Sequence, residues 1–159
     1  MPNGWSIVGQ TPGIQYVGPS NRSTEPHDSG STPSRPLGAD DLAEMLDLAA
    51  RTAPGPFRTR ALELGPIVGI RLDGRLVAMA AQRMRLAGWV EVSAVCTDPE
   101  VRGRGLAAVV VLHQLQLIAA AGARAFLHVA SSNTGAMRLY ERLGFTARSE
   151  MTATALHHD

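Results

Sequence analysis

The sequence contains no lysine, a single cysteine and few aromatic residues. All 15 basic residues among its 159 positions are arginines, and with 14 acidic residues they leave a formal net charge of +1. A surplus this small, with no basic cluster, gives no reason to expect a nucleic acid or a membrane surface as a partner. The lone Cys96 excludes an internal disulfide framework and is typical of a reducing compartment.

Metal-binding and membrane-spanning patterns are absent as well. The five histidines have no spacing with cysteine that predicts a zinc site, so we expect no metal. No stretch is long and apolar enough to cross a membrane, and Met1 is not followed by the charged start and apolar block of a signal peptide. We therefore expect a cytoplasmic protein, with one domain that has a real core.

The first 36 residues differ in composition from the rest. Residues 1–36 hold much of the proline, serine, threonine and glycine, and we interpret them as an N-terminal arm followed by a linker. Within the arm, the alternation of residues 13–18 predicts one short strand, which residues 5–8 could precede. Residues 19–36 are expected to be mobile.

Residues 37–156 predict one α/β domain. A helix is expected from Asp40 to about Thr52, with a capping box between Asp41 and Glu44, and a second short helix over residues 58–64. Asp73 and Gly74 form a strong hairpin signal between strands over residues 67–72 and 75–86, and a strand over 89–97 completes an antiparallel meander.

The second half of this domain begins with an apolar helix over residues 106–121. The strand expected over 124–130 follows this crossover helix and should therefore be parallel to 89–97. A helix over 133–143 and one or two strands over 145–156 complete the prediction, with the last three residues frayed.

The segment from Trp89 to Ala107 carries the first functional signal. Strict alternation in the strand would place Val90, Val92, Ala94 and Cys96 on one face and Glu91, a largely buried carboxylate, on the other. An Arg-Gly-Arg-Gly turn follows and leads into the apolar helix. Glycine backbone can bring N–H groups close to an anion, a helix N-terminus attracts negative charge, and the arginines add positive charge. On its own, such a turn is equally typical of ordinary packing and capping.

A second motif makes the functional prediction specific, because two motifs in a defined order and at a defined spacing are far more specific than either one alone. The first matches at Val95, Pro99, Arg102, Gly103, Gly105 and Ala107, and the second at Asn133, Ala136, Leu139, Tyr140, Gly144 and Phe145. Together they resemble the Gcn5-related N-acetyltransferase (GNAT) superfamily and, within it, the FR47-like branch. The resemblance implies a mixed, mostly antiparallel central sheet flanked by helices, with a parallel, splayed strand pair at the cofactor site.

The resemblance also implies acetyl-CoA as the acyl donor. Its pyrophosphate would bind the turn formed by Arg102, Gly103, Arg104, Gly105, Leu106 and Ala107. Its pantetheine arm would lie along Val95, Cys96 and Thr97 like an added strand, and Asn133 could bond the arm or cap its own helix. Glu100 departs from the superfamily pattern, which usually has Gln or Arg there. Since the turn acts mainly through backbone N–H groups, we expect CoA binding to survive.

Two residues are candidates for the chemistry. Glu91 is the expected base, acting through a water, and its alternative role is a structural ion pair with a nearby arginine. Tyr140, at the position of the family's acid, is expected to protonate the leaving thiolate, and its alternative role is packing at a helix end. We interpret Cys96 as an inert buried thiol on the face opposite Glu91, and His113 and His128 as packed histidines in apolar surroundings.

The sequence thus predicts an N-acyltransferase that moves an acetyl or small acyl group from acetyl-CoA directly to an amine of a small molecule or peptide. The sequence leaves open whether the protein forms a homodimer. The main alternative is a non-catalytic acyl-CoA-binding or interaction module. A nucleotide-binding protein is disfavoured because no lysine, and no serine or threonine for Mg²⁺, follows the glycines as in a P-loop.

Overall fold

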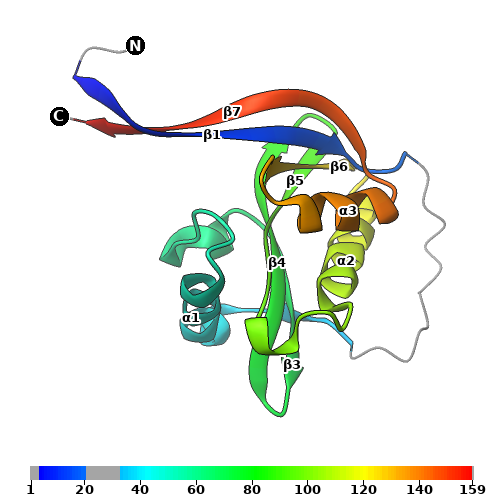
Figure 1. Ribbon diagram of the computed structural model, residues 1–159. Helices are drawn as coiled ribbons and strands as arrows, with labels where there is room; N and C mark the ends of the chain where they lie inside the picture. Colours follow the sequence, from blue (N-terminus) through cyan, green and yellow to red (C-terminus); the bar gives the residue numbers. More distant parts are fainter. Residues whose placement is uncertain (1–3, 21–32, 159) are drawn as a thin grey trace.

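The computed structural model describes residues 4–20 and 33–158, which form one seven-stranded sheet flanked by helices (Figure 1). The strands are β1 (Trp5–Val17), β2 (Arg35–Leu37), β3 (Ile67–Leu72), β4 (Arg75–Leu86), β5 (Trp89–Thr97), β6 (Arg124–Ala130) and β7 (Thr146–His158). The helices are α1 (Leu42–Thr52), α2 (Leu106–Ala120) and α3 (Thr134–Arg142), with 3-10 turns η1 (Ala39–Asp41), η2 (Thr59–Glu63) and η3 (Pro99–Val101). The strand order is β2-β3-β4-β5-β6-β1-β7, and β5 and β6 are parallel while the other neighbours are antiparallel.

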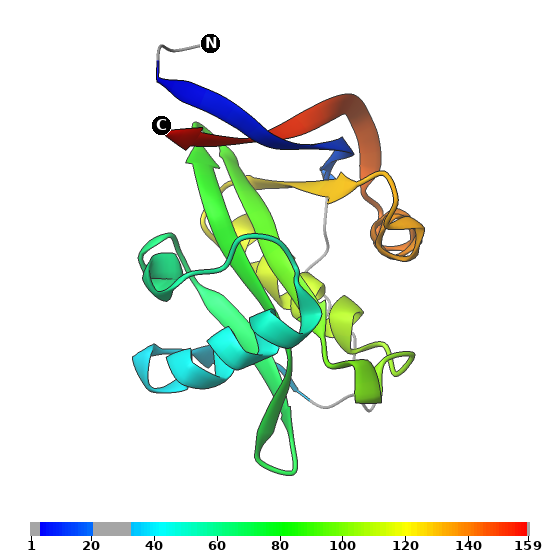
Figure 2. The ribbon, with the colours of Figure 1, turned by 60° about the vertical axis from the view of Figure 1, so that its left-hand side comes forward.

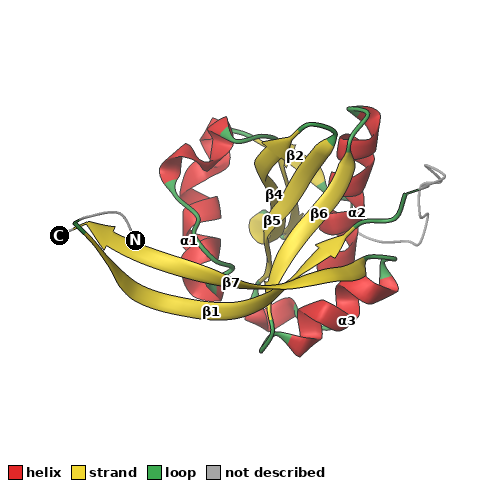
Figure 3. Cartoon of the chain, turned by 90° about the horizontal axis from the view of Figure 1, so that it is seen from above, coloured by secondary structure: helices red, strands yellow, loops and turns green. Residues whose placement is uncertain are grey.

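The helices cover the two faces of the sheet, as seen from above in Figure 3. On one face, Met45 and Leu48 of α1 are fully buried against Met79 of β4 and its neighbours. On the other, α2 buries Val111 and Leu115 with residues of β5 and β6, and α3 packs beside it. α2 is apolar nearly all round because almost its whole circumference is covered, whereas α1 and α3 keep one exposed face.

The central meander is confirmed to the residue. Strands β3, β4 and β5 have the expected bounds, and Asp73 and Gly74 both have positive φ, 49° and 81°, as the tight hairpin requires. The parallel pairing of β6 with β5 is also confirmed, and it follows from the crossover through α2.

β5 contains a bulge that breaks its alternation. Met79 pairs with Cys96 but Ala81 pairs with Ser93, so β5 has one extra residue there, and Ala94 adopts a φ of 49°. Before the bulge Val90 packs towards α2, whereas after it Cys96 packs towards α1. The expected strict alternation is therefore wrong, and Cys96 lies on the same face as Glu91.

The chain termini contribute more structure than the sequence predicts. β1 extends over Trp5–Val17, pairing with β6 on one side and β7 on the other, and the β1–β7 ribbon projects beyond the helices (Figure 2). β7 is one strand that continues through His158, so the frayed end expected for residues 157 and 158 is wrong: His158 pairs with Trp5, and their rings are 4.9 Å apart.

The expected linker is only partly described. Residues 21–32 lie outside the described residues, but β2 pairs with β3 within the stretch predicted to be mobile. The division into an arm over 1–36 and a domain over 37–156 stays a prediction.

Two local helix predictions also differ. The Gly38 N–H donates to Asp41 Oδ2 at 2.8 Å and caps η1, whereas Glu44 binds Arg71 at 2.8 Å and not the helix start. The expected Asp41–Glu44 box is wrong because Arg71 binds both carboxylates, and this pairing lowers the pKa of Glu44. The second short helix is the 3-10 turn η2.

Candidate active site

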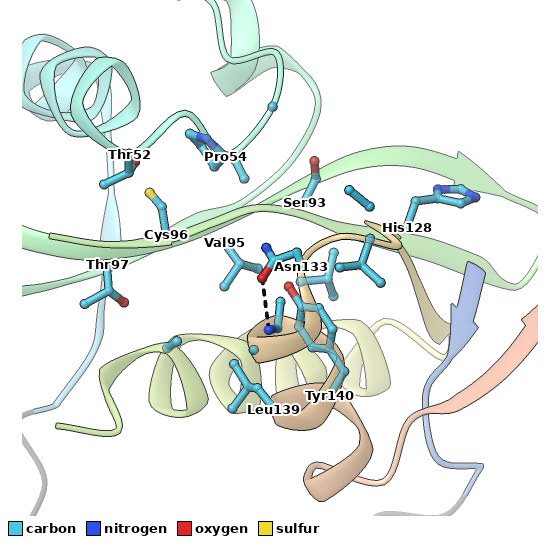
Figure 4. Close-up of a pocket in the computed structure, with 18 of the residues that line it drawn as sticks. Thr52, Pro54, Ser93, Val95, Cys96, Thr97, His128, Asn133, Leu139 and Tyr140 are labelled. Carbon is cyan, nitrogen blue, oxygen red and sulfur yellow. Dashed lines mark hydrogen bonds between the residues drawn. The ribbon is translucent and has the colours of Figure 1, made fainter. Parts of the chain in front are cut away.

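A cleft of about 1270 Å³ opens where β5 and β6 separate. The parallel pairing joins only Trp89–Glu91 to Arg124–Phe126, and beyond it the two strands diverge. The cleft follows β5 to the Arg-Gly turn, with α3 on one side and the 52–56 loop on the other (Figure 4). The splay thus exposes β5 backbone to the cleft.

Most residues selected from the sequence line this one cleft. They are Glu91, Val95, Cys96, Thr97, Arg102, Gly103, Gly105, Leu106, Ala107, Asn133 and Tyr140. Arg104 belongs to the turn but is not among the lining residues. Glu100 is also outside the lining and forms an exposed ion pair with Arg75 at 3.1 Å, so its departure from the family pattern does not touch the cleft wall.

The turn at one end of the cleft has a backbone conformation that suits an anion. Gly103 and Gly105 have φ of 78° and 77°, a conformation that strongly favours glycine, and Gly105 forms the N-cap of α2 without any side-chain cap. The first N–H groups of α2 have no acceptor inside the helix, so they and the positive end of the helix dipole remain for a ligand.

Asp98 holds the strand end from which this turn starts. Its buried carboxylate accepts a hydrogen bond from the Glu100 N–H at 3.0 Å and forms ion pairs with Arg51 and Arg75. The Glu100 hydrogen bond first, and then the Arg51 pairing, lower the pKa of Asp98. The carboxylate is therefore ionised and fixes the path of the chain into the turn.

The Thr97 hydroxyl, at the end of β5, has no hydrogen-bond partner among the described residues. Its Oγ1 atom is buried. A buried hydroxyl without a hydrogen-bond partner lowers the stability of the folded protein unless a ligand forms a hydrogen bond with it. Residues of this cleft therefore fit a ligand that carries an anion at the turn and polar groups along β5, as CoA does.

Asn133 and Tyr140 place polar atoms on the α3 side of the cleft. Asn133 Oδ1 accepts the Ala136 N–H at 3.1 Å, which caps α3, while its amide nitrogen points towards β5 (Figure 4). The Tyr140 ring is buried against Tyr16 and Phe145, and its hydroxyl points into the cleft beside Val95 (Figure 4). Burial raises the pKa of Tyr140 to about 12, so the phenol keeps its proton at neutral pH.

Glu91, at the opposite end of the cleft from the turn, is tightly paired. The carboxylate is 1% exposed and receives two hydrogen bonds from Arg83, Nε to Oε2 at 2.8 Å and Nη2 to Oε1 at 2.6 Å. His128 Nδ1 lies 2.9 Å from Oε1. The ion pair considered as the alternative to catalysis therefore exists, and the expectation that His128 is packed in apolar surroundings is wrong.

Sequence reasoning missed Arg83 and His128 as cleft residues. The sequence predicted that the two strands are parallel but not their register, in which Glu91 pairs with Phe126 and His128 is two residues further along the same face. Arg83 reaches Glu91 through an irregularity of β4 that the sequence does not reveal. Gln82 pairs with Val92 and Arg85 pairs with Val90, so β4 has one extra residue there.

Cys96 and His113 differ in their positions relative to the cleft, since only Cys96 lines it. Cys96 is a buried thiol, as expected, and burial raises its pKa to about 11. His113 Nδ1 lies 2.6 Å from Ser34 Oγ, away from the cleft lining. No three His, Cys, Asp or Glu residues in the described ranges converge as a metal site, and the helices found there are all too short or too polar to span a membrane.

The family model of FR47-like proteins matches residues 67–154, which include β3 to β6, the turn and α3. The chain belongs to the FR47-like family. This FR47-like chain superposes with a TM-score of 0.89 on a crystal structure from Novosphingobium aromaticivorans described as an acetyltransferase of the GNAT family, at 42% identity over 99% of this chain and 69% of that one. The sequence-based predictions of the GNAT superfamily, the FR47-like branch and the fold are confirmed.

Two further relatives are informative. A mycothiol acetyltransferase from Thermomonospora curvata is 38% identical over 103 residues, and the match covers 64% of this FR47-like chain and 33% of that protein. The match thus spans a third of the length of that curated relative. Rv2747 from Mycobacterium tuberculosis, solved in complex with CoA and NLQ, has a TM-score of 0.61 at 18% identity over 73% of this chain and 72% of that one, a likeness of fold alone.

Proposed function

We propose that the chain is an N-acyltransferase that moves an acetyl or small acyl group from acetyl-CoA directly to an amine of a small molecule or peptide. The observation that carries the proposal is the splayed cleft, which has an anion-ready turn at one end and a buried carboxylate at the other. The FR47-like membership supports it, and the relative named mycothiol acetyltransferase supports acetyl as the transferred group.

The donor would lie along β5. The N–H groups at the start of α2, with Arg102 beside them, would bind the pyrophosphate, and backbone groups of Val95 and Thr97 would bond the pantetheine amides as a neighbouring strand does. The Thr97 hydroxyl and the Asn133 amide are further polar partners along this path. Acetyl-CoA held in this way would supply the thioester, and Val95 and Tyr140 would be the residues beside its reacting end.

Residues of the chain would then transfer protons and stabilise the negative charge that develops during the reaction. Glu91 would draw a proton from the acceptor ammonium through a water, which leaves a neutral amine able to attack. The Val95 N–H would donate to the carbonyl oxygen as negative charge develops on it. Tyr140 would donate its proton to the departing thiolate and take one back from the attacking nitrogen, which loses its second proton as the amide forms. Burial raises the pKa of Tyr140 to about 12, so the phenol still holds its proton at neutral pH when the thiolate leaves.

One observation favours a second candidate function. Because Glu91 already accepts hydrogen bonds from Arg83 and His128, it could be purely structural, and the cleft would then bind acyl-CoA without turning it over. In that case CoA would bind with micromolar affinity while no amine accelerated thioester loss.

Two measurements, made one after the other, test the proposal. Calorimetric titration with acetyl-CoA, CoA and longer acyl-CoAs should give micromolar binding that weakens at least about tenfold in an Arg102→Gln/Arg104→Gln variant, since each lost phosphate contact removes a charge-assisted hydrogen bond. Failure to bind any of them would refute the proposal.

The second measurement is a screen of amines for free-thiol release from acetyl-CoA. Glu91→Gln and Tyr140→Phe should each lower kcat by about a hundredfold or more with CoA affinity retained. Binding without turnover by any amine would instead support the acyl-CoA-binding alternative.

A further inference from the structure

A row of hydrogen-bonded side chains reaches Glu91 from the far edge of the sheet. Arg148 of β7 donates from Nη1 to Gln15 Oε1 of β1 at 2.5 Å. Gln15 Nε2 lies 3.0 Å from His128 Nε2 of β6, and His128 Nδ1 lies 2.9 Å from Glu91 Oε1 of β5. Gln15 and His128 are direct cross-strand partners, so their side chains share one face of the sheet. The row therefore crosses four strands and ends on the candidate base.

The direction of every hydrogen bond in this row follows from Arg148. A guanidinium can only donate, so the oxygen of the Gln15 amide must face Arg148 and its NH₂ group must face His128. His128 Nε2 then has to accept, which leaves the ring proton on Nδ1 to be donated to Glu91. The two terminal strands thus determine the tautomer of His128.

The same hydrogen bonds determine which carboxylate oxygen of Glu91 can accept a further hydrogen bond. Oε1 accepts from Arg83 Nη2 and from His128 Nδ1, which uses both of its in-plane lone pairs. Among the described residues, Oε2 accepts a hydrogen bond from Arg83 Nε alone. A carboxylate held in this way has one free acceptor position, and it is on Oε2.

We propose that His128 is a positioning residue for Glu91, that Gln15 and Arg148 fix its tautomer, and that Oε2 is the atom that takes the proton. This inference rests on the proposed acyl transfer. In the step, an N–H bond of the acceptor ammonium breaks and its electron pair stays on nitrogen, the proton passes through one water, and an O–H bond forms on Oε2. The proton later returns to solvent by the same route. His128 gains no proton at any point, because Gln15 presents a donor to its second nitrogen.

Two substitutions at residue 128 distinguish positioning from proton transfer by the ring. In His128→Asn the side-chain amide can place its NH₂ where Nδ1 stood and still donate to Glu91, whereas His128→Leu keeps bulk and removes the donor. We expect kcat to be about tenfold or more higher in His128→Asn than in His128→Leu, with a similar KM for acetyl-CoA in both. Equal loss of kcat in both folded variants would overturn the proposal and make the imidazole the base.

The tautomer itself can be measured without turnover. ¹⁵N NMR of the ring nitrogens, with the signals of residue 128 assigned through His128→Asn, should show a neutral imidazole protonated on Nδ1 near pH 7. Gln15→Glu replaces the donor facing Nε2 by an acceptor of the same shape, and it should put a proton on Nε2. A wild-type ring protonated on Nε2, or on both nitrogens, would overturn the proposal.

The controls separate this inference from the function on which it rests. His157→Leu, an exposed histidine of β7, should leave the residue 128 signals and kcat unchanged, and thermal unfolding should show that all variants fold. A wild-type protein that transfers no acyl group would refute the proposed function, while the tautomer measurement would still decide whether the terminal strands set His128.

Discussion

Arg51, in the last turn of α1, forms an ion pair with the buried carboxylate of Asp98 at the end of β5. This contact joins the helix that precedes the 52–56 loop to the strand end from which the Arg-Gly turn starts. One carboxylate therefore holds the 52–56 side of the cleft to the end of β5, and Arg75 also binds it at 2.5 Å.

Replacing Asp98 by Asn should weaken CoA binding and lower stability together. The amide keeps an acceptor for the Glu100 N–H but loses the charge that holds both arginines. Since the folded-state pKa of Asp98 is lowered, its contribution to stability is present above the ordinary aspartate range and is lost as the pH falls below about 4. Urea unfolding should show a larger difference between wild type and variant at pH 7 than at pH 3. An equal difference at both values would contradict this role.

Gly105→Ala tests the backbone of the turn. Its φ of 77° penalises a side chain by about 1 kcal/mol, although a Cβ there would meet nothing within 4 Å. We expect that loss of stability and, in calorimetry, weaker CoA binding. Gly74→Ala is the matched control, because its φ is 81° in equally open space but it lies in the β3–β4 hairpin away from the cleft. It should lose similar stability with unchanged CoA affinity.

Thr97→Val should have effects of opposite sign on the free and bound protein. Valine has nearly the same shape and removes a buried hydroxyl without a partner, so the free protein should be as stable as wild type or more stable by up to about 1 kcal/mol. If the hydroxyl bonds the donor, CoA affinity should fall about five- to tenfold. Denaturant unfolding and calorimetry measure the two effects, and a variant less stable than wild type with unaltered affinity would contradict both.

Tyr140→Phe should remove a pH dependence of stability at high pH. The pKa of Tyr140 is raised to about 12 by burial, so its unfavourable ionisation lowers wild-type stability between about pH 10 and pH 12. The free energy of unfolding of the variant, measured by urea titration at pH 9 and pH 11, should decline less than that of the wild type. A parallel decline would show that Tyr140 is not the buried group that titrates there.

Most elements of the fold could be predicted because local signals agree with tertiary structure. The Asp73-Gly74 hairpin, the apolar crossover helix and the Asn133 cap each depend on residues close in sequence. The length of β1 could not be predicted, since that strand is stabilised by pairing with β6 and β7, whose residues are far away in the chain.

Most residues that line the cleft could be predicted from the sequence, but the hydrogen bonds between them could not. The motifs identified the turn, β5 and Tyr140, whereas the pairing of Arg83 and His128 with Glu91 depends on strand register. The bulge at Ala94 inverted the predicted side of Cys96, because one extra residue reverses every side chain that follows it.

The position of β1 between β6 and β7 has a consequence for how the molecule assembles. Gln15 and Arg148 are 133 positions apart, so the outer half of the hydrogen-bonded row that reaches Glu91 comes from the first and last segments of the described chain. Contacts this distant in sequence form late and slowly during folding. During synthesis, β7 is the last of the described strands to emerge and can only then pair with β1, so the hydrogen-bonded row to Glu91 is completed after the described elements that line the cleft have been made.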